Sequence, residues 1–372
     1  MINFYCPINQ LGYGIHSFNL LKALDKKGIE LALYPPNNTI DSKDTLVDKW
    51  LNNQKRFSKE DIGVMIFHEN YMNRFYGRVR IGFPVFEVGL RPQDIEMLKT
   101  LDIILQASDY HKSYLNNLGF NNIFVVPEGY DPNVFKFDMV EISKKERILE
   151  ERGVVFSHIG KLEERKSSLD ILKTFTFALL NTSVKCTLIA SMFNPFLPDW
   201  LEVVKECLGK LDYIVQKEDS ATIVFAREML KIIVLKCRVR DVREIYASSH
   251  FGIYASKAEG WNLPLIESIA FGLPCITSDW TGQSEYLKSY PKELIITEGE
   301  SVVANDGKWF FGDRGNWTSP DLSSLKEILK KVVSSPAQYL NLAKKCYDSV
   351  SAFTWESSAN IFINVLKDKN LL

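Results

Sequence analysis

Short apolar runs alternate with longer amphipathic stretches along most of the chain, and this alternation limits the possible folds more than any other feature. Short runs rich in branched apolar residues are typical of buried strands, and apolar residues at helical spacing are typical of helices packed on a sheet. The expected strands of the first part are Ile2–Cys6, Glu30–Tyr34, Val64–Phe67, Arg80–Phe86, Ile103–Gln106 and Ile123–Val126. The expected helices there are Gly14–Lys27, Thr45–Asn53, Pro92–Thr100 and Asp109–Leu118.

The same pattern resumes in the second part of the chain. Strands are expected at Val154–Ile159, Thr187–Ala190, Ile232–Leu235, Phe251–Tyr254, Cys275–Thr277 and Leu294–Ile296. Helices are expected at Leu169–Leu180, Trp200–Leu211, Val242–Ala247 and Leu265–Phe271. Three segments depart from the alternation. The charged stretch Lys136–Arg152 is expected to be a linker, and Tyr213–Met229 is expected to be an insertion of undefined structure. The last segment, Pro320–Leu372, is expected to be helical, with breaks near Pro336 and Phe353.

This order of elements predicts an α/β protein with two Rossmann-like, doubly wound domains facing a cleft. The length of 372 residues also favours two domains. We place a first domain at residues 1–150, a second at 151–352, and a final helical segment at 353–372. Ligands of such sheets bind beyond the carboxyl ends of the strands, so the turns from strand to helix are the places to search for chemistry.

Composition excludes several classes of protein. The net charge is -1, from 45 basic and 46 acidic side chains, which argues against a dedicated nucleic-acid binder. The six cysteines form no C-x-x-C pair, which indicates buried thiols of a reducing compartment. The first residues are expected to form a strand and not a secretory leader, and no long apolar run predicts a membrane span, so we expect a cytoplasmic protein.

The most informative stretch follows the expected strand Phe251–Tyr254 and contains two carboxylates, Glu259 and Glu267. A helix starting at Pro264 would place Glu259 in a loop and Glu267 in the first helical turn. Gly260 allows close approach of a ligand to the backbone, and free N–H groups at Trp261, Asn262 and Leu263 could bind an anion. The plainer alternative is a helix whose acidic first turn complements its dipole.

Three further groups of residues are candidates for the site. After Val154–Ile159 come Gly160, Lys161, Arg165 and Lys166, whose cations could straddle a diphosphate, or else form a solvated charged turn. Gly12 and Gly14 lie in an expected glycine loop after the first strand, a weak signal that would also suit a nicotinamide dinucleotide. His68 and Glu87 end two strands and could position an acceptor hydroxyl or move its proton.

Several of these stretches together resemble the retaining glycosyltransferases of GT-B fold grouped as family 4. Glu259–Glu267 resembles the E-x7-E signature of that family, and residues 281–287 resemble its G-G-x-x-E-x-L element. Residues 160–167 are similar to its G-R-L-x-x-x-K-G loop, 125–135 to its V-P-N-G-V-D run, and 353–359 to its F-S-W-E ending. The chain departs from the family pattern at Lys161 for Arg, and at Ser167 and Asn262 for Gly.

The resemblance implies roles for these residues. Glu259 would face the donor sugar, Glu267 would bind the ribose hydroxyls, and the N–H groups from Gly260 to Leu263 would meet the diphosphate or the sugar. Lys161 and Lys166, with Arg165 as a further cation, would neutralise the leaving nucleoside diphosphate, and Gly12 and Gly14 would face its phosphates. The first domain would hold the acceptor, the second would hold the donor, and the last helix would cross back to the first domain.

The expected activity is therefore metal-independent transfer of a hexosyl-type sugar, with retention, from a nucleotide-diphosphate sugar to a hydroxyl acceptor in glycan or surface polysaccharide assembly. No D-x-D triplet occurs, no metal site is expected, and no cofactor is expected besides the nucleotide sugar as co-substrate. Whether the acceptor is a carbohydrate, a lipid-linked group or a protein stays open, as does a peripheral contact with the inner face of a membrane. The alternatives are a phosphorylase or sugar-phosphate synthase on the same fold, a non-catalytic sugar-nucleotide-binding subunit, and an NAD-dependent oxidoreductase.

Overall fold

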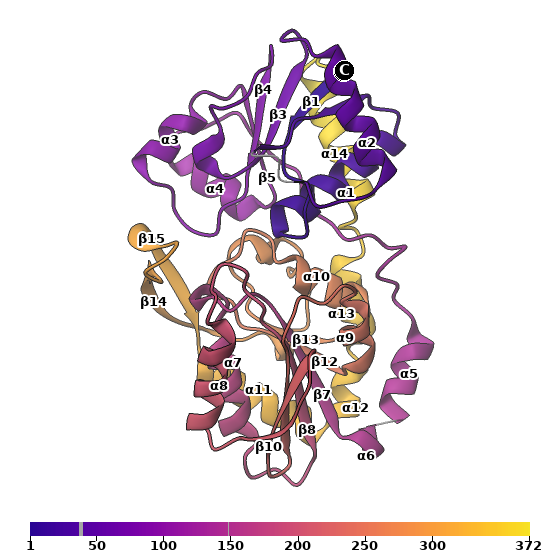
Figure 1. Ribbon diagram of the computed structural model, residues 1–372, viewed down its shortest axis with the longest axis vertical. Coiled ribbons are helices and arrows are strands. Elements are labelled where there is room, and N and C mark those ends of the chain that lie inside the picture. Colours follow the sequence, from indigo (N-terminus) through magenta and orange to yellow (C-terminus); the bar gives the residue numbers. More distant parts are fainter. Residues whose placement is uncertain (37–39, 148) are drawn as a thin grey trace.

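The computed structural model describes residues 1–36, 40–147 and 149–372, and it contains two α/β halves, each built around its own sheet (Figure 1). The first sheet has six parallel strands in the order β2-β1-β3-β4-β5-β6. Their bounds are β1 Ile2–Tyr5, β2 Leu31–Leu33, β3 Ile62–Phe67, β4 Arg80–Pro84, β5 Ile103–Gln106 and β6 Ile123–Val125. The expected strands are confirmed to within a few residues at their ends.

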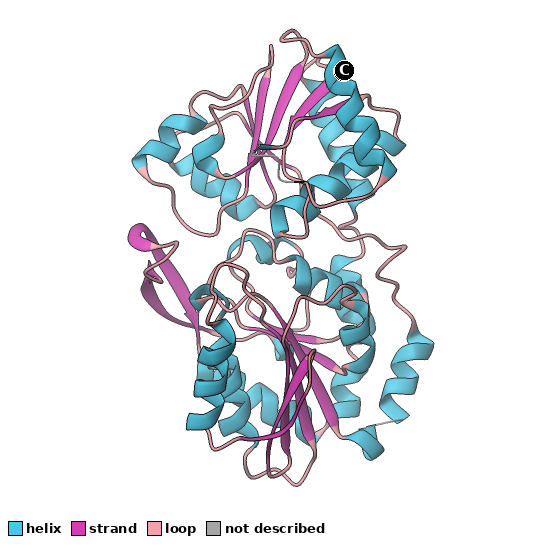
Figure 2. Cartoon of the chain, viewed as in Figure 1, coloured by secondary structure: helices cyan, strands magenta, loops and turns pink. Residues whose placement is uncertain are grey.

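Helices cover both faces of this sheet (Figure 2). They are α1 Gly12–Lys26, α2 Thr45–Asn52, α3 Pro92–Leu98 and α4 Asp109–Asn117. Polar side chains fix two of their starts, because Asp44 accepts from the backbone N–H of Leu46, and Ser108 accepts from that of His111. Strand order reverses at β1, which lies between β2 and β3, so the first sheet has its switch point beside the start of α1.

The second sheet has seven strands in the order β13-β12-β7-β8-β11-β10-β9. Their bounds are β7 Val154–Ile159, β8 Cys186–Ser191, β9 Ile214–Glu218, β10 Thr222–Arg227, β11 Leu230–Leu235, β12 Phe251–Tyr254 and β13 Cys275–Thr277. The first five in this order are parallel, whereas β10 and β9 extend the edge as an antiparallel meander from β11. The expected insertion at 213–229 is therefore two regular strands.

The helices of the second half are α5 Met139–Arg147, α6 Leu149–Arg152, α7 Ser168–Leu179, α8 Trp200–Lys210, α9 Arg243–Ser248, α10 Leu263–Ala270, α11 Leu322–Ser334, α12 Pro336–Leu340 and α13 Ala343–Val350. The charged segment expected as a linker, Lys136–Arg152, lies between the two sheets in the chain, and α5 and α6 occupy most of it. Lys145 of α5 is buried and donates a hydrogen bond to the carbonyl of Tyr246 at 2.7 Å, so this charged segment is fastened to the second half.

Two further differences concern the segment before α11. The strand expected at Leu294–Ile296 is absent, because Lys292–Leu294 is a 3-10 turn and Ile295 forms a single bridge to Thr277. A hairpin that the sequence pattern does not predict follows, made of β14 Glu298–Asn305 and β15 Phe311–Pro320. Figure 1 shows it projecting beside the body of the second half toward the first half.

The last helix, α14 Trp355–Asp368, returns to the first half, as expected (Figure 1). Thr354 caps its start by accepting from the N–H of Ser357. Phe362 lies 6.0 Å from Phe4 of β1, ring centre to ring centre, and Ser358 donates a hydrogen bond to the carbonyl of Pro127. The C-terminal segment thus completes the core of the half that is built from the start of the chain.

Among the described residues, no helix combines the length and the apolar character required to cross a bilayer. The six cysteines are unpaired, and four of them, Cys6, Cys186, Cys275 and Cys346, are buried.

The packing of α14 leads to a prediction about stability. Replacing buried Phe362 by alanine removes the ring that contacts Phe4 and leaves a cavity, so Phe362→Ala should lower the free energy of unfolding by about 3–5 kcal/mol. Urea unfolding measures the loss. Asn364→Ala, on an exposed position of the same helix, should change stability little, and equal losses in the two variants would contradict the docking of α14.

Candidate functional site

The carboxyl ends of the central strands of both sheets meet at the junction between the halves. The loop after β12 approaches the segment after β4 so closely that a Cβ atom on Gly260 would lie 2.4 Å from Cγ1 of Val85. The hydroxyl of Tyr13, from the start of α1, donates to the carbonyl of Val85 at 2.5 Å. This is the place where the topology of doubly wound sheets puts a ligand, and the candidate residues gather here.

The central feature is a buried ion-pair cluster around Glu259. Its carboxylate accepts from Nη1 of Arg165 at 2.8 Å and from Nζ of Lys166 at 2.7 Å. Burial alone would raise the pKa of Glu259, but the charges of Lys166 and Arg165 outweigh it and lower the pKa to about 2. Glu259 is therefore a permanent anion, held by two cations from the 3-10 turn after β7.

Other charged residues extend this cluster across the junction. Nη2 of Arg165 lies 3.1 Å from Glu163 and 3.3 Å from Glu87, which follows β4 of the first half. Nζ of Lys161 pairs with Glu163 at 2.5 Å and stands over the ring of Phe196. Glu163 is not among the predicted site residues, although its position between Lys161 and Arg165 in the sequence is the signal that could have indicated it.

Glu267 differs from Glu259 in having no partner. It lies on α10, and because Asn262 is the N-cap and the helix starts at Leu263, Glu267 falls in the second helical turn, which corrects the expected placement in the first turn. Its half-buried carboxylate makes no hydrogen bond or ion pair with any residue that the structure describes. Burial raises its pKa to about 8. An unpaired, desolvated carboxyl is well suited to accept hydrogen bonds from ligand hydroxyls.

The loop between the two carboxylates offers backbone donors. Within the described part of the chain, the N–H groups of Gly260, Trp261 and Asn262 have no intramolecular acceptor. The ring of Trp261 lies 5.0 Å from that of Tyr286 and 5.8 Å from that of Phe353, so the ring is packed against other aromatic side chains. Leu263 is buried at the start of α10 and contributes packing.

Three residues around this loop have a left-handed backbone conformation although none is glycine. They are Ser167 with φ 51°, Asn262 with φ 73° and Thr281 with φ 59°. Each stands where the resembling family has glycine, which explains that family pattern physically, because glycine takes positive φ without a Cβ clash. Asn262 tolerates the conformation best and adds a bond from Nδ2 to Oε1 of Gln283 at 2.8 Å.

The two candidate glycines of the first half are not equivalent. Both lie in the first turn of α1, which starts at Gly12, and not in a loop before the helix as expected. A Cβ atom on Gly12 would meet nothing within 4 Å, so this position faces open space, whereas one on Gly14 would clash with the backbone of Asn9 at 2.3 Å. The requirement for glycine at Gly14 is therefore one of packing. The packing requirement for glycine is weaker at Gly160, because a Cβ atom there would lie 3.3 Å from Cδ of Lys166, on a flexible side chain.

On the side of the first half, His68 follows β3 at the edge of the junction. Its Nδ1 lies 3.3 Å from the hydroxyl of Tyr13, and the two rings meet edge to face.

Hairpin β14–β15 contacts the first half through Arg314. Glu69, next to His68, is buried and pairs with Nη1 of Arg314 at 2.6 Å, and the N–H of Gly89 donates to the carbonyl of Arg314 at 2.9 Å. Hairpin β14–β15 thus fastens the second half to the first, a contact for which the sequence carries no recognisable signal.

The structure therefore brings together Glu259, Arg165, Lys166 and Glu87 in one network, with Lys161 joined to it through Glu163. Glu267 and the loop N–H groups lie on the same loop and helix as Glu259, and His68 stands across the junction on the first half. No group of three or more metal-ligating side chains gathers anywhere in residues 1–36, 40–147 and 149–372.

Comparisons with known proteins identify a matching family model and a relative. Residues 210–305 match the family model described as "Glycosyl transferases group 1". A protein of Acidianus filamentous virus 2 (isolate Italy/Pozzuoli), described as "Putative glycosyltransferase ORF330", is 26% identical over 247 residues. That match covers 65% of this chain and 61% of the viral protein, so the chain matches less than two thirds of its relative. Both descriptions support a glycosyltransferase.

Solved structures show the fold of the whole chain. Sucrose-phosphate synthase from Thermosynechococcus elongatus superposes with a TM-score of 0.68 at 13% identity, covering 99% of this chain and 98% of that one. Anabaena Alr3699/HepE, solved in complex with UDP and glucose, has a TM-score of 0.64 at 13% identity, covering 99% of both chains. Trehalose-6-phosphate synthase OtsA has a TM-score of 0.66 at 12% identity, covering 98% of both. The chain has the GT-B fold of two Rossmann-like units.

The raised pKa of Glu267 predicts how stability depends on pH. An ordinary glutamate in the unfolded chain ionises near pH ~4.3, whereas folded Glu267 keeps its proton until about pH 8. Between these values the unfolded state has released a proton that the folded state retains, so the contribution of this group to stability falls as pH rises. Glu267→Gln does not titrate, and should gain on the order of 2 kcal/mol over wild type across this window. Urea unfolding over the window measures it.

The control for this experiment is Glu244→Gln, an exposed carboxylate on α9. Its stability difference from wild type should stay flat with pH. If the difference for Glu267→Gln is also flat, the carboxyl of Glu267 is solvated as in the unfolded chain and the inferred desolvation is wrong.

The strained turn at Ser167 gives a separate prediction. Ser167→Gly should stabilise the protein by about 1 kcal/mol, because glycine removes the Cβ clash at positive φ. Ser167→Ala keeps the Cβ and removes only the buried, unpartnered hydroxyl, so the difference between the two variants isolates the backbone strain. Thermal and urea unfolding of both variants check it, and a glycine variant no more stable than the alanine variant would contradict the strain.

Proposed function

We propose that this protein is a retaining glycosyltransferase of the group resembling family 4, which transfers a hexosyl-type sugar from a nucleotide-diphosphate sugar to a hydroxyl acceptor without a metal ion. The observation that supports this most is the pairing of Glu259 with Arg165 and Lys166 next to the unpaired carboxyl of Glu267. The matched fold and the family description favour sugar transfer over NAD-dependent oxidation.

In this proposal the cations act on the leaving group. Arg165 and Lys166, with Lys161 at the edge, would stabilise the charge that grows on the diphosphate as the bond from the sugar C1 to the phosphate oxygen breaks. The N–H groups of Gly260 to Asn262 would bind further diphosphate or sugar oxygens. Cations and backbone dipoles can supply this stabilisation without a bound metal ion, which is why we propose metal independence.

Glu259 and Glu267 would hold the two ends of the donor. Glu267 would accept hydrogen bonds from the ribose hydroxyls, and Glu259 would face the sugar once the diphosphate has taken over part of its contacts with Lys166 and Arg165. Retention follows if the acceptor oxygen attacks C1 from the face that the diphosphate leaves. The acceptor proton then passes to the departing phosphate oxygen, so no enzymic nucleophile is required.

The first half would supply the acceptor side of the reaction. His68 and Glu87 lie at the ends of adjacent strands, β3 and β4, and Glu87 already reaches Arg165 across the junction. His68 would position the acceptor hydroxyl, and Glu87 would couple its arrival to the cation cluster. We place this activity in the cytoplasm, in glycan or surface polysaccharide assembly, with the nucleotide sugar as co-substrate and no other cofactor.

A nucleotide-binding experiment tests the proposal. Thermal unfolding of the wild type should shift with one nucleoside diphosphate from a panel of UDP, GDP, ADP, CMP, NAD and NADP, without added metal. At 100 times the dissociation constant the shift corresponds to about 2.7 kcal/mol. Glu267→Ala should abolish the shift, because the ribose hydroxyls lose their acceptor.

The matched control is Glu206→Ala, an exposed glutamate on α8 of the same half, which should shift as the wild type does. A shift with NAD or NADP alone would contradict the proposal in favour of an oxidoreductase. An unchanged nucleoside diphosphate shift in a folded Glu267→Ala protein would contradict the assignment of the site.

A further inference from the structure

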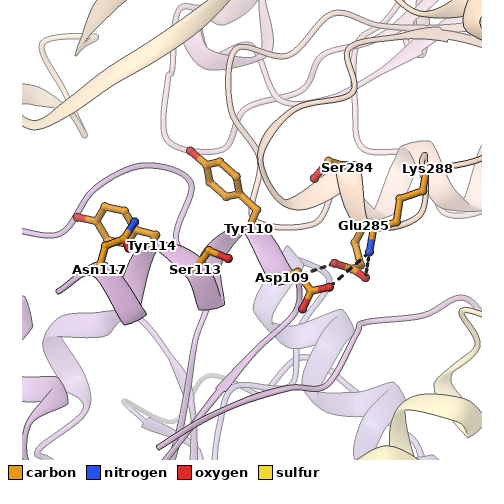
Figure 3. Close-up of a pocket in the computed structure, with 8 residues that line it drawn as sticks. All are labelled: Asp109, Tyr110, Ser113, Tyr114, Asn117, Ser284, Glu285 and Lys288. Atoms are coloured by element: carbon orange, nitrogen blue, oxygen red, sulfur yellow. Dashed lines mark hydrogen bonds and ion pairs between the residues drawn. The ribbon is translucent and has the colours of Figure 1, made fainter. Parts of the chain in front are cut away.

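A separate, widely open cavity with a volume of about 450 Å³ lies between the two halves, lined by α4 on one side and by η5 (Thr281–Glu285) with Lys288 on the other (Figure 3). Its open shape suits a ligand that lies along the surface, such as one part of a longer chain. None of the residues proposed above to bind the donor or to act on it lines this cavity. It is therefore a second candidate site of the molecule.

The lining combines an aromatic surface with neutral hydrogen-bonding groups. Tyr110 and Tyr114 present rings, Ser113 and Ser284 present hydroxyls, and Asn117 presents an amide. Tyr110 is 46% exposed, and its side chain stands between Tyr114 and Ser284 in the view of Figure 3. Rings that pack against the C–H face of a sugar, beside hydroxyl and amide groups that can both donate and accept, suit a carbohydrate.

The charges of the cavity exclude an anionic ligand. Nζ of Lys288 lies 2.8 Å from Glu285 and 3.4 Å from Asp109, so the single cation of the lining is already shared by two carboxylates. Glu285 also accepts from the backbone N–H of Asp109 at 2.8 Å, at the start of α4. An incoming phosphate would meet an excess of negative charge, whereas the hydroxyls of an uncharged polyol would meet carboxylate oxygens with capacity to accept.

The cavity is joined to the candidate donor site through one short element. The hydroxyl of Thr281 accepts from the N–H of Glu259 at 2.9 Å, and the N–H of Gly282 donates to the carbonyl of Glu259 at 2.9 Å. The same turn continues into Ser284 and Glu285, which line the cavity. A ligand in the cavity would contact η5, the element that positions Glu259, and would lie between the two halves.

We propose that this cavity is a subsite for uncharged sugar units of a carbohydrate acceptor, distant from the hydroxyl that reacts. The inference rests on the proposed function, since it names the acceptor class of the same enzyme. With such a subsite the preferred acceptor would be a neutral oligosaccharide. The residues of α4 and η5 that line the cavity would then influence how long an acceptor chain the enzyme prefers.

The test uses the full chain with UDP present and a glycan array that carries neutral, phosphorylated and carboxylated oligosaccharides. Wild-type protein should bind neutral oligosaccharides in preference to the charged ones. Tyr110→Ala and Asn117→Ala should weaken this binding about tenfold each, through loss of ring packing and of a hydrogen bond. Tyr110→Phe should retain most of the binding, because it keeps the ring. Tyr76→Ala, which removes an exposed tyrosine outside the cavity, should bind as wild type does.

The nucleoside diphosphate shift in thermal unfolding separates the two proposals. If that shift is present but no neutral glycan binds, or if Tyr110→Ala and Asn117→Ala bind as wild type does, the subsite is wrong and the proposed transfer reaction is unaffected. A preference for phosphorylated glycans would likewise overturn the subsite. If neutral glycans bind through Tyr110 but no nucleotide produces a shift, the cavity is a carbohydrate site and its role as an acceptor subsite is overturned.

Discussion

The pairing of Glu259 with Arg165 and Lys166 is the interaction on which the rest of the site depends. Removing one member of such a buried group leaves an unpaired charge, which typically costs about 3–5 kcal/mol, so the loops after β7 and β12 are held in one relative position. The network contains three cations and three carboxylates, counting Lys161, Glu163 and Glu87, and is therefore neutral without a ligand. A diphosphate must compete with these carboxylates. It gains an advantage over simple anions only if its sugar and ribose also reach the loop N–H groups and Glu267.

Several polar and apolar contacts join the two halves. Gly260 against Val85, Arg165 with Glu87, and Arg314 of the hairpin with Glu69 are the polar and steric links nearest the candidate site. Relative motion of the two halves is the expectation for two-domain folds of this kind. The hairpin β14–β15 belongs to the second half and is bonded to loops of the first. Any relative motion of the two halves would therefore change the contacts of this hairpin.

The sequence was sufficient to predict the alternation of strands and helices, the two sheets and the residues of the charged loop, because each depends on local periodicity or on motifs a few residues long. The return of α14 was expected only from the resemblance to the GT-B family. The sequence was insufficient where contacts distant in the chain decide the outcome. The charges of Lys136–Arg152 predict an exposed segment, and nothing in its local pattern indicates that Lys145 is buried against the carbonyl of Tyr246. The bond from Arg314 of the hairpin to Glu69 of the first half joins residues far apart in the chain, and the position of Glu267 in the second turn of α10 follows from Asn262 being the N-cap.

The positive φ angles connect these observations. Ser167, Asn262 and Thr281 lie in the turns that hold Lys166, Glu267 and Glu259 in place, and each non-glycine residue at such an angle costs on the order of 1–3 kcal/mol. The cost is offset by bonds that a glycine could not make at two of the three positions: Asn262 donates to Gln283, and the hydroxyl of Thr281 accepts from the N–H of Glu259. Side-chain bonds therefore replace backbone freedom in this loop. A loop fixed in this way holds its free N–H groups in one direction before a ligand arrives, which lowers the ordering cost of binding a diphosphate.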